Sequence, residues 1–192
     1  MTLIKLVILD RDGTINVDSD EYIKSPAEWL PQPGSLEAIA RLNHAGWHVV
    51  IASNQSGLGR GLFEVTDLNA VHTLMHQQLA EFGGRVDAVF YCPHAPDEAC
   101  HCRKPQPGLL EQIAERYGIS LKGVPMVGDA LRDLLAGVSV GCEPHLVLTG
   151  KGAAYQGRPL PETFPDTTRV HADLSACVDF LLAREDAMQA AQ

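Results

Sequence analysis

The sequence predicts an α/β fold, a three-layer, Rossmann-like parallel sheet with helices on both faces. Short apolar runs alternate along the chain with segments whose apolar residues recur at helical spacing. This alternation is typical of parallel sheets, in which the crossover helices cover both faces. A length of 192 residues suits one domain, which we expect to span residues 1–192.

Each predicted strand is a short apolar run, and each predicted helix carries a one-sided apolar pattern. The predicted strands are Leu3–Leu9, Trp47–Ala52, Ala88–Tyr91, Pro125–Val127 and His145–Leu148. The predicted helices are Ser35–Ala45, Thr66–Phe82, Pro107–Tyr117, Leu131–Val138 and Leu174–Arg184. The segment 150–165 is rich in Gly and Pro, which predicts an irregular connection within the domain.

Composition and charge narrow the possible functions. Hydrophobic residues make up 45% of the chain and charged residues 20%, as in ordinary globular proteins. The formal net charge of −9 argues against nucleic-acid binding, because contact with a phosphate backbone needs an excess of Lys and Arg. The sequence has no apolar run long enough to cross a bilayer and no signal-peptide cleavage pattern. We therefore expect a cytoplasmic monomer that binds a small molecule, without a nucleic-acid or membrane partner.

Polar residues follow the predicted strands at the points where those strands end. In a parallel sheet, ligands bind beyond the carboxyl ends of the strands, so we expect these residues to converge. They are Asp10 and Asp12, Ser53 to Ser56, Arg103 and Lys104, and Asp129 with Asp133. The spacing of Asp10 and Asp12 matches the two-residue period of an extended chain, so both are expected to project to the same side.

These residue types favour phosphoryl transfer with magnesium. Asp10, Asp12 and Asp129 would repel one another at one place unless a cation were present, and oxygen ligands suit magnesium. Lys104 and the Ser53 hydroxyl would complement a dianionic phosphoryl group. One aspartate can attack phosphorus, and the other can transfer protons to the leaving oxygen and from water.

Alternative interpretations stay open for single residues. Asp and Gly favour turns, so Asp10 and Asp12 taken alone also fit a turn. Asp133 is either a solvated residue in the first turns of a helix or a support for the site. The segment Gly57–Gly61 matches neither the dinucleotide fingerprint nor the P-loop. It is either a flexible connection or a loop at the substrate entrance, with Arg60 available to an anion.

A second group of candidate ligands follows the third predicted strand. Cys92, His94, Cys100 and Cys102 supply three thiolates and one imidazole, the ligand set of a closed, structural zinc site. The one-residue gaps are tighter than the usual spacing, and a reduced thiol cluster is the alternative. His101 is a competing ligand. Zinc would pin a loop that leads directly to the basic residues of the site.

In combination, these residues resemble the motifs of the haloacid dehalogenase-like phosphatase superfamily. The matching motifs, between about Leu3 and Thr149, are Asp10-x-Asp12-Gly13-Thr14, Ser53, Lys104 and Gly128-Asp129-x-x-x-Asp133. The resemblance implies that Asp10 is the nucleophile forming an aspartyl-phosphate and that Asp12 is the general acid and base. It also implies that Ser53 and Lys104 hold the phosphoryl group. Magnesium would be bound by Asp10, Asp129 and the backbone carbonyl of Asp12.

Within this superfamily, the sequence is similar to the heptose 1,7-bisphosphate 7-phosphatases and to the histidinol-phosphate phosphatases. Arg60-Gly61 and Pro107-Gly108 resemble the heptose enzymes more. The similarity implies hydrolysis of the 7-phosphate in the synthesis of precursors for lipopolysaccharide or surface glycans, with histidinol phosphate as the alternative substrate. The sugar bisphosphate would contact Asp18, Ser19, Asp20, Glu21, Ser53, Asn54, Gln55, Ser56, Arg60, Arg103 and Lys104.

The sequence departs from the family pattern near the predicted substrate contacts, and these departures change what we expect of the site. The segment 19–22 differs from the His-Gly-Tyr often found there and is one residue longer, which bears on its sugar contacts. Ala130 follows Asp129 where relatives often have a basic residue, so Lys104 is expected to carry more of the positive charge. No segment is long enough for a large inserted cap domain, so we expect loops to recognise the substrate.

Several remaining residues are expected to play no part in the chemistry. His72 and His76 are predicted to lie on a helix surface, and Cys142 and Cys177 to be small buried hydrophobes. The sequence assigns no role to Arg11. A polynucleotide 3′-phosphatase shares the motifs but conflicts with the net charge. A non-catalytic, zinc-stapled binding module is the alternative of another class, and the intact pair of motif aspartates argues against it.

Overall fold

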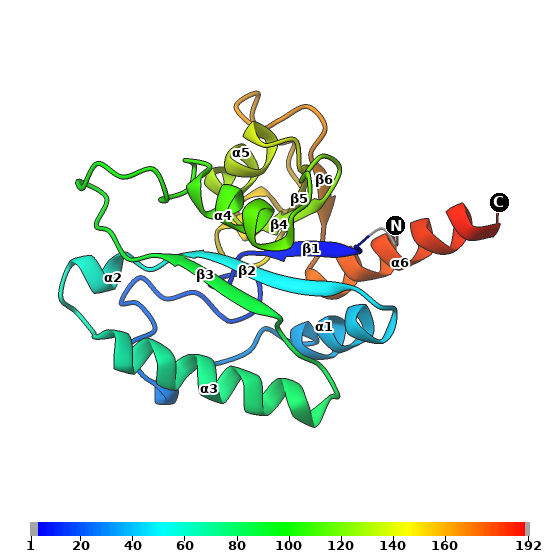
Figure 1. The fold of residues 1–192 in the computed structure, drawn as a ribbon. Coiled ribbons are helices and arrows are strands. Elements are labelled where there is room, and N and C mark those ends of the chain that lie inside the picture. The colour runs from blue at the N-terminus through cyan, green and yellow to red at the C-terminus, as the bar shows by residue number, and fades with distance from the viewer. Residues whose placement is uncertain (1–3, 191–192) are drawn as a thin grey trace.

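The computed structural model of the protein describes residues 4–190, which form one parallel sheet of six strands (Figure 1). The strands are β1 (Leu6–Leu9), β2 (His48–Asn54), β3 (Ala88–Cys92), β4 (Pro125–Gly128), β5 (Glu143–Val147) and β6 (Arg169–His171). Their order across the sheet is β3-β2-β1-β4-β5-β6, and every neighbouring pair is parallel. Because β1 lies between β2 and β4, the motifs that follow these three strands meet at one edge.

Helices occupy both faces of this sheet (Figure 1). The α-helices are α1 (Ser35–His44), α2 (Ser56–Gly59), α3 (Val65–Glu81), α4 (Gly108–Tyr117), α5 (Leu131–Ser139) and α6 (Leu174–Ala190). Two short 3-10 helices are η1 (Pro26–Glu28) and η2 (Gly150–Tyr155). The three-layer α/β architecture predicted from the sequence is therefore confirmed.

The core lies on both faces because successive residues of a strand point in opposite directions. Val7 and Leu9 of β1 pack with residues of α1, α3 and α6. Leu6 and Ile8 pack with residues of α4 and α5 on the other face. The four apolar residues of β1 are thus fully used in packing, and its polar chemistry begins only where the strand ends.

The structure differs from the sequence prediction mainly at short elements and element ends. β6 was not predicted, because three residues are too few to show a period. The helix α6 continues past Arg184 to Ala190. Leu3, the predicted start of the first strand, lies outside the described residues. Within residues 4–190, no helix is long and apolar enough to cross a membrane, and the segment between Asp12 and Ser53 contains only η1, α1, β2 and loops.

Candidate active site

A cluster of buried charges lies at the carboxyl end of β1. Lys104 Nζ lies 2.8 Å from Asp10 Oδ1 and 2.7 Å from Asp133 Oδ1, and it donates to the Ala52 carbonyl oxygen at 2.6 Å. Asp129 completes the group, because one carboxylate oxygen each from Asp10, Asp129 and Asp133 lies within 4.8 Å of the others. All four charged side chains are buried. One lysine therefore faces three carboxylates away from water.

The pKa values in this cluster reflect crowding of negative charge. Burial and the neighbouring Asp133 raise the pKa of Asp10 to about 6, although Lys104 opposes the change. Burial and the carboxylates of Asp10 and Asp133 raise the pKa of Asp129 to about 8. Burial alone would lower the pKa of Lys104, but attraction to Asp10 and Asp133 raises it. A divalent cation bound among the carboxylates would relieve this excess of negative charge.

Two glycines leave the space that Asp129 occupies. A Cβ on Gly13, whose φ is +84°, would lie 2.1 Å from Asp129 Oδ2, and a Cβ on Gly150, whose φ is +51°, would lie 2.2 Å from it. Asp129 Oδ2 accepts a hydrogen bond from the Lys151 backbone N–H at 2.7 Å. Its buried Oδ1 has no hydrogen-bond partner among the residues that the structure describes. A buried, unpaired carboxylate oxygen beside two further carboxylates suits a metal ligand.

Asp12, the second motif aspartate, has both carboxylate oxygens occupied. Its Oδ1 accepts hydrogen bonds from Arg11 Nη2 at 2.8 Å and from Asn16 Nδ2 at 2.9 Å. Its Oδ2 accepts from Gln55 Nε2 at 2.8 Å. Burial alone would raise the pKa of Asp12, but the Arg11 charge and the hydrogen bonds from Asn16, Arg11 and Gln55 lower it. These contacts favour the carboxylate form of Asp12, which forms part of a cavity wall.

The end of β2 links Asp12 to the loop that carries Lys104. Gln55 Nε2 donates to Ser53 Oγ at 2.8 Å as well as to Asp12. Asn54 Nδ2 donates to the Lys104 carbonyl oxygen at 3.0 Å, and the Lys104 backbone N–H donates to Asn54 Oδ1 at 3.0 Å. These hydrogen bonds hold three segments that are distant in sequence in one arrangement.

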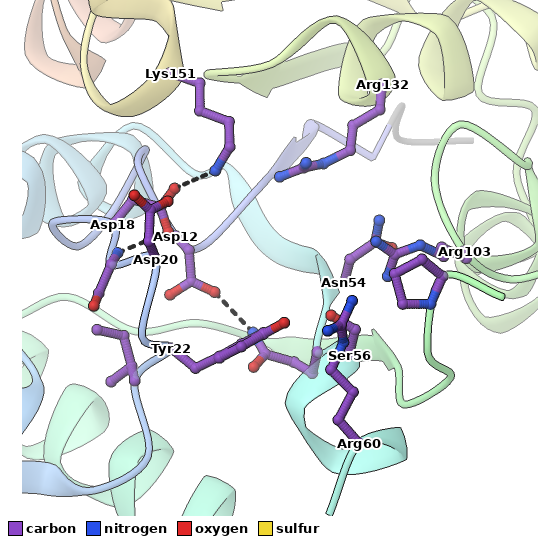
Figure 2. A pocket seen from close by; sticks show the side chains of 14 residues that line it. Asp12, Asp18, Asp20, Tyr22, Asn54, Ser56, Arg60, Arg103, Arg132 and Lys151 are labelled. Carbon is purple, nitrogen blue, oxygen red and sulfur yellow. Dashed lines mark hydrogen bonds and ion pairs between the residues drawn. The ribbon is translucent and has the colours of Figure 1, made fainter. Parts of the chain in front are cut away.

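A cavity of about 230 Å³ opens beside Asp12 (Figure 2). Its acidic wall includes Asp18 and Asp20 from the loop after β1. The cations that line it are Arg60, Arg103, Arg132 and Lys151. Lys151 Nζ lies 2.5 Å from Asp18 Oδ2, so one ion pair joins the acidic and basic walls. Cations and carboxylates around one small cavity suit an anionic ligand that also carries hydroxyl groups.

Most residues predicted to contact a substrate line this cavity. They are Asp18, Ser19, Asp20, Asn54, Gln55, Ser56, Arg60 and Arg103. Ser53 and Lys104 are each 1% exposed and are not part of the cavity lining. Glu21 is exposed and is not part of the cavity lining. The predicted segment 18–21 thus contributes its first three residues to the cavity wall.

Five lining residues were not predicted: Tyr22, Ile23, Pro96, Arg132 and Lys151. The sequence offered a signal for Lys151, because it follows the fifth strand closely and residues beyond strand ends form such sites. Arg132 corrects the expectation drawn from Ala130. The basic group absent at position 130 is supplied two residues later, from the first turn of α5, and its Nε is buried without a hydrogen-bond partner among the described residues.

The predicted thiol and imidazole ligands also converge. Cys92 Sγ lies 3.4 Å from His94 Nδ1 and 3.8 Å from Cys100 Sγ. His94 Nδ1 lies 3.2 Å from Cys102 Sγ, and one ligand atom from each of the four residues lies within 4.8 Å of the others. The competing His101 is exposed and pairs with a carboxylate of α4 at 2.6 Å. The geometry therefore favours His94 as the imidazole of a possible metal site.

Among the residues expected to play no part, His72 departs from its prediction. It is half-buried rather than on the helix surface, and its Nε2 lies 3.1 Å from Arg11 Nη1. Burial, together with the Arg11 charge, lowers the pKa of His72 to about 4. His76 is exposed, as expected. Cys142 and Cys177 are buried, as expected, and burial raises the pKa of each thiol to about 12.

The fold and the acidic site define a class of protein, the haloacid dehalogenase-like hydrolases. A family model described as HAD-hydrolase-like matches residues 101–176. A solved structure of D,D-heptose 1,7-bisphosphate phosphatase from Bordetella bronchiseptica, complexed with magnesium and phosphate, superposes with a TM-score of 0.90 at 55% identity, covering 94% of this chain and 99% of that one. The corresponding enzyme from Burkholderia thailandensis gives a TM-score of 0.71 at 50% identity, covering 92% of this chain and 98% of that one.

Curated relatives narrow the class to one family. The D-glycero-beta-D-manno-heptose-1,7-bisphosphate 7-phosphatase of B. bronchiseptica is 56% identical over 180 residues, 93% of this chain and 98% of the relative. The enzyme of the same name from Pseudomonas aeruginosa is 52% identical over 177 residues, 92% of this chain and 97% of the relative. The chain belongs to the family of D-glycero-beta-D-manno-heptose-1,7-bisphosphate 7-phosphatases, and it is a phosphoric monoester hydrolase, as the sequence motifs predicted.

Proposed function

We propose that the protein removes the 7-phosphate of D-glycero-D-manno-heptose 1,7-bisphosphate through an aspartyl-phosphate intermediate. Its pathway would be the synthesis of ADP- or GDP-heptose precursors for lipopolysaccharide core or surface glycans. The observation that carries the proposal is the buried group of Asp10, Asp129, Asp133 and Lys104 beside a cavity lined by cations. The names of the relatives supply the substrate.

The acidic cluster fits magnesium, which binds hard oxygen ligands and retains several waters. The unpaired Asp129 Oδ1 and the raised pKa values of Asp10 and Asp129 support this assignment. Asp10, Asp129 and the backbone carbonyl of Asp12 would hold the ion, so an Asp12 side-chain variant should still bind metal. When bound, magnesium neutralises negative charge on the transferring phosphoryl group.

The side chains then divide the reaction between them. A carboxylate oxygen of Asp10 attacks phosphorus, forming the Asp10–phosphoryl bond while the bond from phosphorus to the sugar oxygen breaks. Asp12, in its protonated form, gives that proton to the departing sugar oxygen and becomes a carboxylate. In the second half, Asp12 takes a proton from water, whose oxygen attacks phosphorus and displaces the Asp10 carboxylate. Ser53 and Lys104 would hold the phosphoryl oxygens throughout.

The cavity accounts for a substrate with two phosphates. One phosphate would reach Asp10, while the cations Arg60, Arg103, Arg132 and Lys151 are available to the other. Arginine binds phosphate through paired donors, which fixes orientation as well as charge. Asp18, Ser19 and Asp20 would accept or donate hydrogen bonds to the sugar hydroxyls. Glu21 would make no contact with the sugar hydroxyls, because it lies outside the cavity lining.

We also propose that Cys92, His94, Cys100 and Cys102 bind zinc. Three sulfurs and one imidazole nitrogen make a closed tetrahedral set, which leaves no position for substrate. The ion would therefore be structural. Its loop leads directly into Arg103 and Lys104, so zinc would hold the segment that delivers both side chains.

A substrate panel tests the proposal. Phosphate release would be measured from the heptose 1,7-bisphosphate, histidinol phosphate and a 3′-phosphorylated oligonucleotide, each with and without magnesium. We expect magnesium-dependent release from the heptose bisphosphate alone at high efficiency. Strong preference for histidinol phosphate would overturn the heptose assignment. Absence of activity on every sugar phosphate would favour a zinc-stapled binding module.

A further inference from the structure

Arg11 is a buried cation that lies between the two motif aspartates in sequence. In the part of the chain that the structure describes, it forms hydrogen bonds with Asp12 and none with Asp10. Its side chain is 0% exposed. Its Nη2 donates to both oxygens of Asp12, at 2.8 and 3.1 Å, and its Nε donates to Asp12 Oδ1 at 3.2 Å. This planar, forked contact is one that a guanidinium makes and an ammonium cannot.

Residues outside the catalytic motifs hold Arg11 in turn. His72 Nε2 lies 3.1 Å from Arg11 Nη1, and because arginine can only donate, Nε2 accepts and the neutral ring carries its proton on Nδ1. The Arg11 guanidinium lies 6.0 Å from the centre of the Trp29 ring. Trp29 Nε1 donates to Gln78 Oε1 at 2.9 Å, so α3 supports both partners of Arg11.

We propose that Arg11 is a positioning residue that holds the Asp12 carboxylate in the orientation needed for proton transfer, and that His72 fixes Arg11. The inference rests on the proposed function, since it assigns a task to a neighbour of the proposed acid and base. Without Arg11, only Asn16 would donate to one oxygen of Asp12 and only Gln55 to the other. A carboxylate on the wall of a cavity would then rotate more freely.

The role separates two events that general damage to the structure would impair together. Attack by Asp10 depends on Lys104, which bonds Asp10 directly, and not on Arg11. Departure of a sugar oxygen needs a proton from Asp12, whereas p-nitrophenolate leaves as a stable anion without one. The kcat/KM of each substrate covers the steps through departure of the leaving group. Misplacement of Asp12 should therefore affect an alkyl phosphate far more than an aryl phosphate.

Arg11→Met and Arg11→Lys test this directly. We expect Arg11→Met to lower kcat/KM for the heptose bisphosphate about 100-fold, and for p-nitrophenyl phosphate by less than about tenfold, since general acid catalysis commonly contributes at least the larger factor. Arg11→Lys keeps the charge but loses the fork, so it should resemble Arg11→Met. Equal losses on both substrates, or no loss on either, would overturn the proposal.

Variants of His72 provide a milder test, because they keep the Arg11 side chain and change only its partner. His72→Leu removes the acceptor for Arg11 Nη1, and His72→Gln returns an acceptor oxygen. In His72→Leu we expect a loss of roughly three- to tenfold, selective for the alkyl phosphate, which is the range for one ordinary hydrogen bond. His72→Gln should recover the activity. His76→Leu, on the exposed side of the same helix, is the matched control and should change nothing. An unselective loss in His72→Leu, or none, would contradict the proposal.

Failure of the proposed function would give a different pattern. Wild-type protein that hydrolyses other alkyl phosphates but not the heptose bisphosphate would overturn the substrate assignment alone. The comparison of alkyl and aryl esters would then be made with the substrate that it does hydrolyse. Wild-type protein without activity on any phosphate ester would overturn both inferences.

Discussion

Two regions of the sheet treat their charges in opposite ways. At the β5–β6 edge, Glu143 is paired with Arg169 at 2.8 Å and with Arg184 at 2.5 Å, so one carboxylate has two cations. At the carboxyl ends of β1 and β4, one lysine faces three carboxylates. The nearby Arg132 Nε and Asp129 Oδ1 are buried without hydrogen-bond partners among the described residues. The edge supplies more cations than carboxylates, whereas the buried site holds more carboxylates than its one lysine can pair and leaves single buried atoms without hydrogen-bond partners.

The difference separates groups that stabilise the fold from groups arranged to bind a ligand. Native proteins pair most buried polar atoms, and the exceptions concentrate at functional sites. Substitutions in the unmatched region should therefore change activity more than stability. Substitutions at the paired edge should do the reverse and change stability more than activity.

Asp10→Asn should have the largest effect. An amide cannot form the aspartyl-phosphate, so turnover should fall by roughly 10⁴-fold or more, the scale seen when a covalent nucleophile is removed. The assay is phosphate release from the heptose bisphosphate, together with trapping of the phosphoenzyme in wild type. Activity left intact in Asp10→Asn would rule out the covalent mechanism.

Arg132→Met should mainly weaken substrate binding. Loss of a charged donor from the cavity should raise KM by about 10- to 100-fold, corresponding to one charge-assisted hydrogen bond. The melting temperature would be measured in parallel to separate a lost substrate contact from lost stability, because the Arg132 charge also interacts with the carboxylates of the buried cluster. Arg116→Met, exposed on α4, is the matched control. An unchanged KM would remove Arg132 from the substrate contacts.

Removal of zinc should lower both stability and substrate binding. Cys100→Ser should lose the ion, lower the melting temperature and raise KM roughly tenfold, the low end of effects from residues that support a binding site indirectly. Magnesium dependence should change less, because the carboxylate cluster is separate. Metal content, melting and kinetics would be measured beside Cys142→Ala, a cysteine outside the cluster. Zinc-free protein with unchanged melting and kinetics would refute the structural role.

Glu143→Gln should affect stability alone. Burial would raise the pKa of Glu143, but hydrogen bonds from Arg184 and Arg169 lower it to about 2, below the ordinary value of 4.5. The stabilisation is therefore present above pH 4.5 and is lost as the pH falls toward 2. We expect a loss of about 1 kcal/mol at pH 7, typical of a partly exposed ion pair, and a smaller difference at pH 3. Urea unfolding measures it, with exposed Glu115→Gln as control, and a loss of phosphatase activity would contradict the contrast.

The sequence predicted the parts of the site that follow directly from strand ends. Asp10, Ser53, Lys104 and Asp129 occupy the positions where a parallel sheet places its ligands. The structure brings Asp10, Lys104 and Asp129 together, and Ser53 is buried at the end of β2. The cysteine and histidine cluster was also predictable, because its ligands lie within one loop. Their shared feature is that chain direction and short-range spacing are enough to locate them.

The remaining contacts depend on how distant elements pack. Arg11 lies between the two motif aspartates in sequence, but only the placement of α3 shows that His72 meets it. Arg132 reaches the cavity because α5 starts immediately beyond β4. Sequence spacing does not fix the direction that α5 takes from that point. The strand β6 is held by pairing with β5 rather than by a pattern of its own. Long-range packing, not local preference, decides each of these cases.

The central position of β1 has a consequence for how the chain folds during synthesis. Lys104 and Asp10 are 94 residues apart in sequence, and the hydrogen bond from Thr149 Oγ1 to the Gly13 carbonyl oxygen spans 136 residues. As the chain emerges from its N-terminus, β1 can pair with β2 early, yet its other edge stays open until β4 is made. That open apolar edge is a site for aggregation in the interval. Recovery of phosphatase activity after refolding therefore reports that the crossover from β3 to β4 is complete.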